Sequence, residues 1–268
     1  MTDRKQEERL DYLVEAFKNE NREYSNLTTP EDKVGKQHLL RSLMNLRRPQ
    51  ETPEEVLRVQ DEYLTERNRE RGIVTLDEIP EIREGLSVWQ GDITRLAVDA
   101  IVNAANSEML GCFIPMHACI DNCIHTYAGV QLRAECGRQI NRLRAEFGAD
   151  YVQPTAVPML TDAYNLPAKK IIHIVGPIVY DRLTPALEQD LADCYLRTLD
   201  LCEKEGLRSV AFCCISTGVF HFPNDRAAAI AVETVEQWRS EHSGAVDRVI
   251  FNVFKDEDLH LYETLLKA

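Results

Sequence analysis

Two thiols and an imidazole fall within one short stretch of the chain, at Cys112, His117 and Cys119. Thiolate sulfur and imidazole nitrogen suit zinc, with bonds of about 2.3 Å and about 2.0–2.1 Å respectively. Structural zinc normally has four protein ligands, and Cys123 and His125 are the obvious candidates for the fourth. If neither binds, the fourth position is open to water or substrate, as in catalytic zinc sites. A cysteine-containing loop without metal is the alternative.

Polar residues and glycine follow several of the expected strands. Asp92 comes after a strand and a glycine, Asn103 and Asn106 follow a second strand, and residues 216–220 follow a buried strand. In open α/β sheets, ligands bind at the carboxyl ends of strands, and glycine with backbone amides near a helix start favours anions. Together these loops indicate a nucleotide-like ligand with a diphosphate. Taken singly, an Asp after a Gly is more often a turn residue than a ligand contact.

Asp121 and Asn122 stand at the start of the helix expected after the cysteine loop. An acidic residue at this position often only complements the helix dipole. Four further cysteines in apolar surroundings are interpreted as buried small hydrophobic residues, namely Cys194, Cys202, Cys213 and Cys214. Four histidines without an evident partner in the sequence are interpreted as structural or surface residues, namely His38, His173, His242 and His260.

Strands alternate with helices from about residue 87, which predicts an α/β sheet with helices on both faces. The expected strands are 87–90, 98–102, 155–159, 170–175, 209–215 and 249–254. The expected helices are 117–145, 185–204, 224–240 and a last one at the C-terminus.

Residues 1 to about 85 predict further helices. Apolar residues between Leu10 and Phe17 recur at helical spacing. The Thr-Pro-acid sequences at 29–32 and 52–55 are typical of helix starts, and Glu55 is placed for a capping box. Because this segment holds few apolar residues, we expect a helical cap that rests on the following domain.

The composition excludes several classes of protein. A net charge of −13 is unsuited to a general nucleic-acid binder. No run approaches the roughly 18 apolar residues of a membrane helix, and the charged N-terminus lacks a signal-peptide stretch. Eight cysteines in such a chain favour metal binding or core packing over disulfides. We therefore expect a cytoplasmic protein without a membrane or nucleic-acid partner.

Two of these segments closely resemble a known family. Residues 91–106 are similar to the opening of a macrodomain, and residues 215–223 resemble the second phosphate loop of that family. Many macrodomains carry a run of glycines where this chain has the cysteine loop, 111–122, which resembles the zinc-dependent macrodomain class of microbes. Residues 39–49 resemble the helical extension of that class. His221 departs from the family, in which glycine is frequent at this position.

The resemblance implies a three-layer α/β/α macrodomain with a mixed central sheet at 85–268 and an N-terminal helical extension at 1–84. It also implies a hydrolase that removes mono-ADP-ribose from protein side chains, with an Asp or Glu linkage, and so reverses sirtuin-type ADP-ribosylation. A lipoyl-carrier protein of the glycine cleavage type is the modified partner that it suggests. The alternatives are a non-catalytic ADP-ribose reader with a structural zinc, and a zinc-stabilised scaffold that binds a protein through its N-terminal helices.

The resemblance also assigns roles to single residues. Asp92 would accept a hydrogen bond from the adenine amino group, beside the backbone of Ile93. Asn106 would hold the distal ribose, and Asp121 would orient a water molecule. One zinc ion per chain would polarise the ribose hydroxyls or lower the pKa of water toward about 7. Its ligands would be Cys112, His117 and Cys119, with Cys123 left to packing. The ribose and phosphates would be lined by Cys119, Ile120, Asp121, Asn122, Ser216, Thr217, Gly218, Val219 and Phe220.

Overall fold

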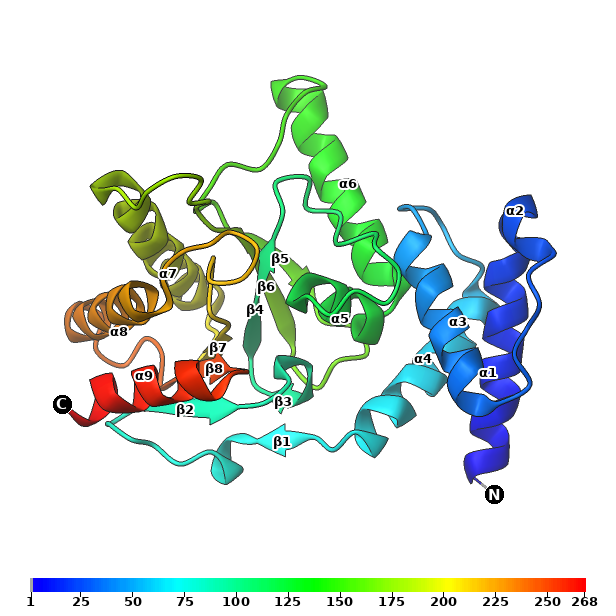
Figure 1. The fold of residues 1–268 in the computed structure, drawn as a ribbon, viewed down its shortest axis with the longest axis horizontal. Helices are drawn as coiled ribbons and strands as arrows, with labels where there is room; N and C mark the ends of the chain where they lie inside the picture. The colour runs from blue at the N-terminus through cyan, green and yellow to red at the C-terminus, as the bar shows by residue number, and fades with distance from the viewer. Residues whose placement is uncertain (1) are drawn as a thin grey trace. The chain divides into compact units, whose positions relative to one another are not determined.

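The computed structural model describes residues 2–268, with side chains from Arg4 onward. Its contacts divide the chain into two compact units (Figure 1). The helical unit comprises the residues up to Gly72 together with Leu110–Ala149 and Ala163–Leu166, and the sheet unit comprises Ile73–Met109, Asp150–Asp162 and Pro167–Ala268. The expected boundary between residues 84 and 85 stays a prediction.

The helical unit is built around an apolar core that its first helices share. These helices are α1 (Thr2–Asn19), α2 (Arg22–Ser25), α3 (Lys33–Leu46) and α4 (Glu54–Glu70). Buried residues of α1, α3 and α4, such as Leu13, Leu43 and Leu64, form one cluster. The helices α5 (Ile120–Ala128) and α6 (Val130–Phe147) belong to the same unit. The predicted N-terminal helices are therefore confirmed.

Three details of the predicted helices are wrong. The cap of α3 is Asp32 rather than Thr29, since the Asp32 carboxylate accepts the Gly35 N–H at 2.8 Å. No capping box starts α4, because the Thr52 hydroxyl accepts a hydrogen bond from Arg47 Nη2 at 2.8 Å instead. The single helix expected over 117–145 is two helices, α5 and α6. Gly129 separates them with a φ of +103°, which an L side chain rarely adopts.

The sheet unit contains a mixed sheet, as predicted. Its strands are β2 (Leu86–Gln90), β4 (Ala100–Ala105), β5 (Met159–Asp162), β6 (Lys170–Val175), β7 (Ser209–Phe212) and β8 (Arg248–Val253), in the order β2-β8-β7-β4-β6-β5. All neighbouring pairs are parallel except β5 with β6. The residues of β7 are all buried, as the apolar run there predicts.

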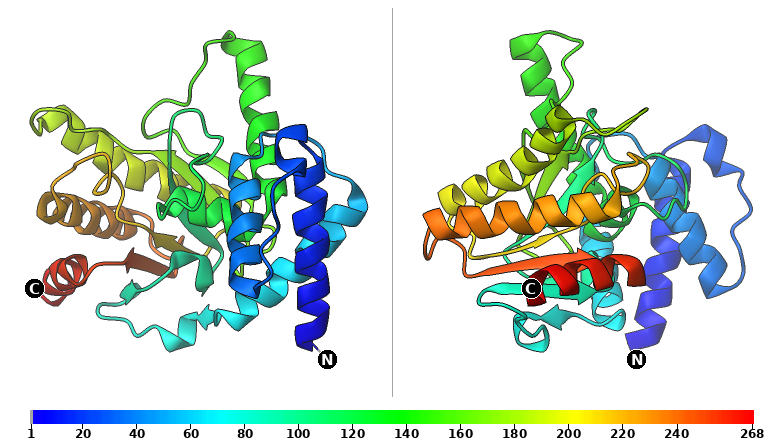
Figure 2. Two further views of the ribbon diagram at one scale, coloured as in Figure 1. Left: turned by 45° about the vertical axis from the view of Figure 1, so that its right-hand side comes forward. Right: turned by 60° about the vertical axis from the view of Figure 1, so that its left-hand side comes forward.

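Helices α7 (Pro185–Glu205), α8 (Asn224–Glu241) and α9 (Asp256–Lys267) belong to the sheet unit. The two views in Figure 2 show α7 and α8 side by side, and α9 packs on α8 and β2. Thr184 caps α7 and Gly206 ends it in the left-handed conformation. Among the residues described, no helix is both long and apolar enough to cross a membrane.

The sheet unit also contains short elements, and two of its strands begin later than predicted. β1 (Val74–Thr75) pairs with β3 (Leu96–Ala97), beside the short helices η1 (Leu76–Glu78) and η2 (Ile93–Arg95). The strand expected at 98–102 lies at Ala100–Ala105. The strand expected at 155–159 begins only at Met159. Pro154 and Pro158 lack an N–H for a sheet ladder, which accounts for this late start.

Candidate ligand and metal sites

The carboxyl ends of the parallel strands meet at one edge of the sheet unit, here named the ligand edge. Asp92 follows β2, Asn106 follows β4, and the loop 216–220 comes after β7. Because β2, β8, β7, β4 and β6 all run in the same direction, these segments lie at the same edge. The structure therefore brings together the sequence-predicted ligand residues that belong to the sheet unit.

Asp92 is the cap residue of η2, and its carboxylate is held in place by its own turn. Oδ1 accepts hydrogen bonds from the Thr94 N–H at 3.0 Å and the Thr94 hydroxyl at 2.6 Å. Ile93 is buried next to it. This turn presents a fixed acceptor at the end of β2, and the Ile93 side chain serves as its apolar anchor.

Asn106 and Asn103 have different surroundings. The half-buried Asn106 accepts the Glu108 N–H on Oδ1 at 3.0 Å, which fixes the orientation of its amide. Asn103 lies inside β4 and is fully buried, with Nδ2 at 3.0 Å from His173 Nδ1. Asn103 is therefore an interior residue, whereas Asn106 lies just beyond the strand.

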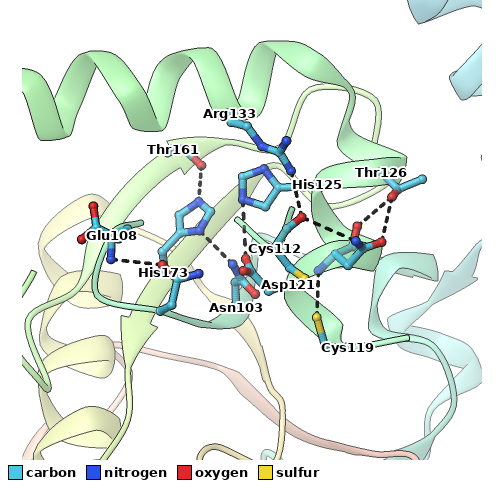
Figure 3. A network of polar contacts seen from close by, with 12 residues as sticks. Asn103, Glu108, Cys112, Cys119, Asp121, His125, Thr126, Arg133, Thr161 and His173 are labelled. Carbon is cyan, nitrogen blue, oxygen red and sulfur yellow. Dashed lines mark hydrogen bonds and ion pairs between the residues drawn. The ribbon is translucent and has the colours of Figure 1, made fainter. Parts of the chain in front are cut away.

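His173 links two strands inside the sheet unit, between Asn103 and Thr161 (Figure 3). Since an amide Nδ2 can only donate, His173 Nδ1 accepts and Nε2 carries the proton. Nε2 then donates to the Thr161 hydroxyl at 3.0 Å. Burial lowers the pKa of His173 to about 3, so the ring is neutral. Its interpretation as a structural histidine fits these contacts.

The loop after β7 is held in a tight turn. Ser216 has a φ of +66°, and its carbonyl accepts the Phe222 N–H at 3.0 Å. The Thr217 hydroxyl donates to the Cys214 carbonyl at 3.1 Å. Gly218 and Val219 are exposed at the tip, where a Cβ on Gly218 would have open space around it. Backbone amides at such a turn suit a phosphate group.

Sequence patterns did not point to two exposed aromatic residues of the sheet unit. Phe254 directly follows β8, the neighbour of β2, and is 78% exposed. Tyr180 is 85% exposed and lies in the segment after β6, where the Val179 N–H donates to the Phe220 carbonyl at 2.9 Å. The signal that could have identified Phe254 is its position, because it follows a strand at the ligand edge.

The cysteine loop lies in the helical unit and brings its three predicted donors together. One donor atom each of Cys112, His117 and Cys119 lies within 4.8 Å of the others, and Cys112 Sγ is 3.5 Å from His117 Nδ1. Ligands that share a tetrahedral zinc are about 3.6 Å apart, given bonds of about 2.0–2.3 Å. In the part of the chain that is described, this group does not include Cys123 or His125. The donor chemistry and spacing fit one metal ion.

Cys119 occupies the cap position of α5, ahead of Ile120. Its sulfur accepts the Asn122 N–H at 3.4 Å. Burial, with the nearby Cys112 and Asp121, raises the pKa of Cys119 to about 12. A cation shared by these thiols would favour the thiolate form.

Asp121 and Asn122 form the first turn of α5, and both are buried. The Asp121 carboxylate is 3.6 Å from His125 Nε2. The Asn122 side chain bonds inside the unit, since Nδ2 donates to the Ile114 carbonyl at 2.9 Å and Oδ1 accepts from Arg41 at 2.9 Å. Asn122 therefore holds the cysteine loop, a contact that its position in the sequence did not predict.

Comparison with protein families gives one match, in which the Macro domain family model covers residues 102–231. A protein of Treponema medium named "Protein-ADP-ribose hydrolase" is 48% identical over 265 residues, which is 97% of this chain and 99% of that protein. A protein of Staphylococcus aureus strain MRSA252 with the same name is 44% identical, over 95% of this chain and 94% of its own length.

The fold is also similar to solved structures. A Trypanosoma brucei macrodomain in complex with ADP-ribose superposes with a TM-score of 0.64 and 28% identity. The match covers 84% of this chain and 94% of that one. This similarity confirms the predicted fold class.

Proposed function

The chain belongs to the macrodomain family, and on that basis we propose that it is a hydrolase that releases ADP-ribose from modified proteins. The observation that carries the proposal is the likeness to two protein-ADP-ribose hydrolases along nearly the whole chain, N-terminal helices included. The macrodomain with bound ADP-ribose adds support for the ligand.

The ligand edge supplies the groups that ADP-ribose requires. The carboxylate of Asp92, oriented by Thr94, accepts from the adenine amino group. Phe254 offers an exposed ring for stacking on the adenine. The loop 216–220 surrounds the diphosphate with backbone amides, and exposed Gly218 lets the ligand come close.

On the family resemblance, we propose that Asn106 of the sheet unit holds the distal ribose. The Glu108 N–H donates to Oδ1 of Asn106 and so fixes the amide, whose Nδ2 would donate to a ribose hydroxyl. This contact holds the ribose for attack, and correct positioning alone lowers a barrier considerably. For Asp121 of the helical unit, a buried residue whose carboxylate lies 3.6 Å from His125 Nε2, we propose that the carboxylate orients the attacking water. Water adds to the ester, and free ADP-ribose and the protein carboxylate leave.

We place one zinc ion at Cys112, His117 and Cys119. Two thiols and an imidazole are suited to zinc, and their donor atoms are close enough to share one ion. When bound, zinc supplies a Lewis acid that polarises an oxygen or makes a bound water more acidic. With three protein ligands, a coordination position is left for substrate or water.

The proposed substrate is a protein with mono-ADP-ribose on an Asp or Glu side chain, modified by a sirtuin-type transferase. A lipoyl-carrier protein of the glycine cleavage type is the candidate partner. Both rest on the resemblance of residues 111–122 to the zinc-dependent class.

The test is a hydrolysis assay on Asp/Glu-linked and Ser-linked mono-ADP-ribosylated proteins, with a zinc chelator and with zinc added back. Chelation and Cys119→Ser should each slow release by about a hundredfold or more, since a Lewis acid supplies several kcal/mol. Cys202→Ser is the matched control, because Cys202 is a cysteine of α7 in the sheet unit, outside the donor group.

Two results would contradict the proposal. Unchanged turnover by Cys119→Ser would exclude a catalytic role for zinc. A stable complex that never releases ADP-ribose would identify a reader with a structural zinc.

A further inference from the structure

Helix α3 of the N-terminal extension makes direct hydrogen bonds to the cysteine loop. Arg41 Nη2 donates to the His117 carbonyl at 2.8 Å. Asn45 Oδ1 accepts the Met116 N–H at 3.0 Å. Met116 has a φ of +59°, which is rare for a residue with a side chain. The bond from Asn45 therefore holds a strained residue directly before the donor His117.

Asn122 connects Arg41 to the other two donors, Cys112 and Cys119, by hydrogen bonds. The guanidinium that holds His117 also donates to Asn122 Oδ1 at 2.9 Å. Asn122 in turn donates from Nδ2 to the Cys112 carbonyl at 3.5 Å and from its backbone N–H to Cys119 Sγ. The hydrogen bonds around Arg41 thus reach the sulfur or backbone of all three donors.

Arg133 of α6 ties the same loop to the end of α3. Its Nη1 donates to the carbonyls of Asn45 and Arg47 at 2.6 and 2.7 Å. Its Nη2 donates to the Cys112 carbonyl at 3.1 Å (Figure 3). The guanidinium also lies over the Phe113 ring, 4.3 Å from its centre. One buried cation therefore joins α3 to Cys112.

The loop has little packing of its own to define its shape. It lies outside regular secondary structure, and Ile114 is 59% exposed. Its geometry therefore depends on hydrogen bonds to neighbouring helices. Groups that orient metal ligands from outside typically change metal affinity or activity by about 10–100-fold when they are removed.

We propose that Arg41 and Asn45 are positioning residues of the zinc centre, so that the N-terminal extension forms part of the metal site. This inference rests on the proposed zinc centre at Cys112, His117 and Cys119. Neither residue belongs to the group of donor atoms. Both act by holding the backbone on either side of the imidazole donor.

The test measures metal binding by the full-length chain rather than turnover. Zinc affinity is determined by competition with a chromophoric chelator, and cobalt(II) absorption reports the geometry of the thiolate site. The variants are Arg41→Met, Arg41→Lys and Asn45→Leu. Arg58→Met is the matched control, since Arg58 is an arginine of α4 that makes only surface ion pairs among the described contacts.

Arg41→Met and Asn45→Leu should each weaken zinc binding by about 10–100-fold and shift the cobalt bands. Arg41→Lys should lose less, because lysine keeps one donor for the His117 carbonyl. Arg58→Met should stay within about twofold of wild type, as exposed ion pairs contribute little. Thermal unfolding in chelator checks the fold, and Arg41→Lys and Asn45→Leu carry the test if Arg41→Met does not fold.

Wild-type zinc affinity and an unchanged cobalt spectrum in folded Arg41→Met or Asn45→Leu would overturn the inference and leave the zinc centre intact. Failure of the wild-type chain to bind zinc or cobalt would overturn the centre itself, and the inference with it.

Discussion

Replacement of Arg133 by methionine should destabilise the helical unit strongly. The side chain is 4% exposed, and its two terminal nitrogens donate to four carbonyls, those of Met44, Asn45, Arg47 and Cys112. Three of these carbonyls belong to the C-terminal end of α3, where helix carbonyls lack partners within the helix. Methionine matches the apolar stem but supplies no donor.

The magnitude follows from two opposing terms. Hydrogen bonds from a charged donor contribute about 1.5–3 kcal/mol each, so four of them total roughly 6–12 kcal/mol. Against this, burial lowers the pKa of Arg133 to about 10 from 12.5, which corresponds to a cost of about 3 kcal/mol for the buried charge. Arg133→Met removes both terms and leaves the carbonyls unsatisfied. The difference between the two terms is about 3–9 kcal/mol, and we expect the lower part of that range, about 3–5 kcal/mol, because the two hydrogens of Nη1 serve three of the four carbonyls.

The assay is thermal unfolding in chelator, so that metal binding makes no contribution. At about 2–4 °C per kcal/mol, the midpoint should fall by roughly 10 °C. The control is Arg69→Met, an arginine of α4 whose side chain is 64% exposed and pairs with Glu66. It should change stability by less than about 0.5 kcal/mol. A loss below about 1 kcal/mol in Arg133→Met would refute the account of these bonds.

Three further predictions concern the sheet unit. Gly176→Ala should weaken ADP-ribose binding in calorimetry by about tenfold or more, because the new Cβ would lie 2.2 Å from Ser216 Oγ and displace the loop. Adding Ser216→Ala should restore part of the affinity, and an unchanged affinity in the single variant would contradict the clash. Phe254→Ala should weaken ADP-ribose binding by about 1–2 kcal/mol through the loss of stacking. The melting temperature should not change, since the ring is exposed. An affinity equal to that of the wild type would exclude stacking. The pKa of His173 is about 3 in the folded protein, below its usual value of 6.5. The neutral, buried ring therefore contributes its full stability above pH 6.5. Below that pH the unfolding free energy falls by about 1.4 kcal/mol per pH unit, until the pH approaches 3. Between pH 6.5 and 5, His173→Gln should therefore lose about 2 kcal/mol less unfolding free energy than wild type, and equal losses would show that His173 is not buried in neutral form.

The closeness of Cys112, His117 and Cys119 could be predicted from the sequence, because these side chains stand near one another along the chain. Three ligand-forming side chains stand within eight positions, so the chain itself keeps them close wherever the loop lies. The ligand edge could be predicted for a related reason. Parallel strands bring their carboxyl ends to one edge whatever their order, and Asp92 and Asn106 each follow such a strand.

Arg41, Asn45 and Arg133 could not be identified in the same way. They bind backbone groups, which are the same in every residue and leave no pattern in the sequence. Arg41 and Asn122 are 81 positions apart, so their contact depends on the tertiary fold. The split between α5 and α6 was missed because Gly129 interrupts a pattern that is otherwise helical on both sides.

The core of the helical unit also has a consequence for the order in which the protein is assembled. The apolar cluster that α1, α3 and α4 share takes all its buried members except Val130 from the first 64 residues. At a synthesis rate of about 5–20 residues per second, roughly 3 to 12 seconds pass between completion of α4 at Glu70 and the appearance of Val130. These helices can therefore pack while the rest of the chain is still being made.

Several of the contacts that the early helices make with later segments are hydrogen bonds of amide side chains. Asn45, Gln60 and Asn68 bond to residues 116–131 and 165, which have not yet been synthesised at that stage. Amide groups can bond to water in the meantime, so these positions stay hydrated on the growing chain and do not favour aggregation. The cysteine loop then folds against a template that already carries its hydrogen-bonding groups.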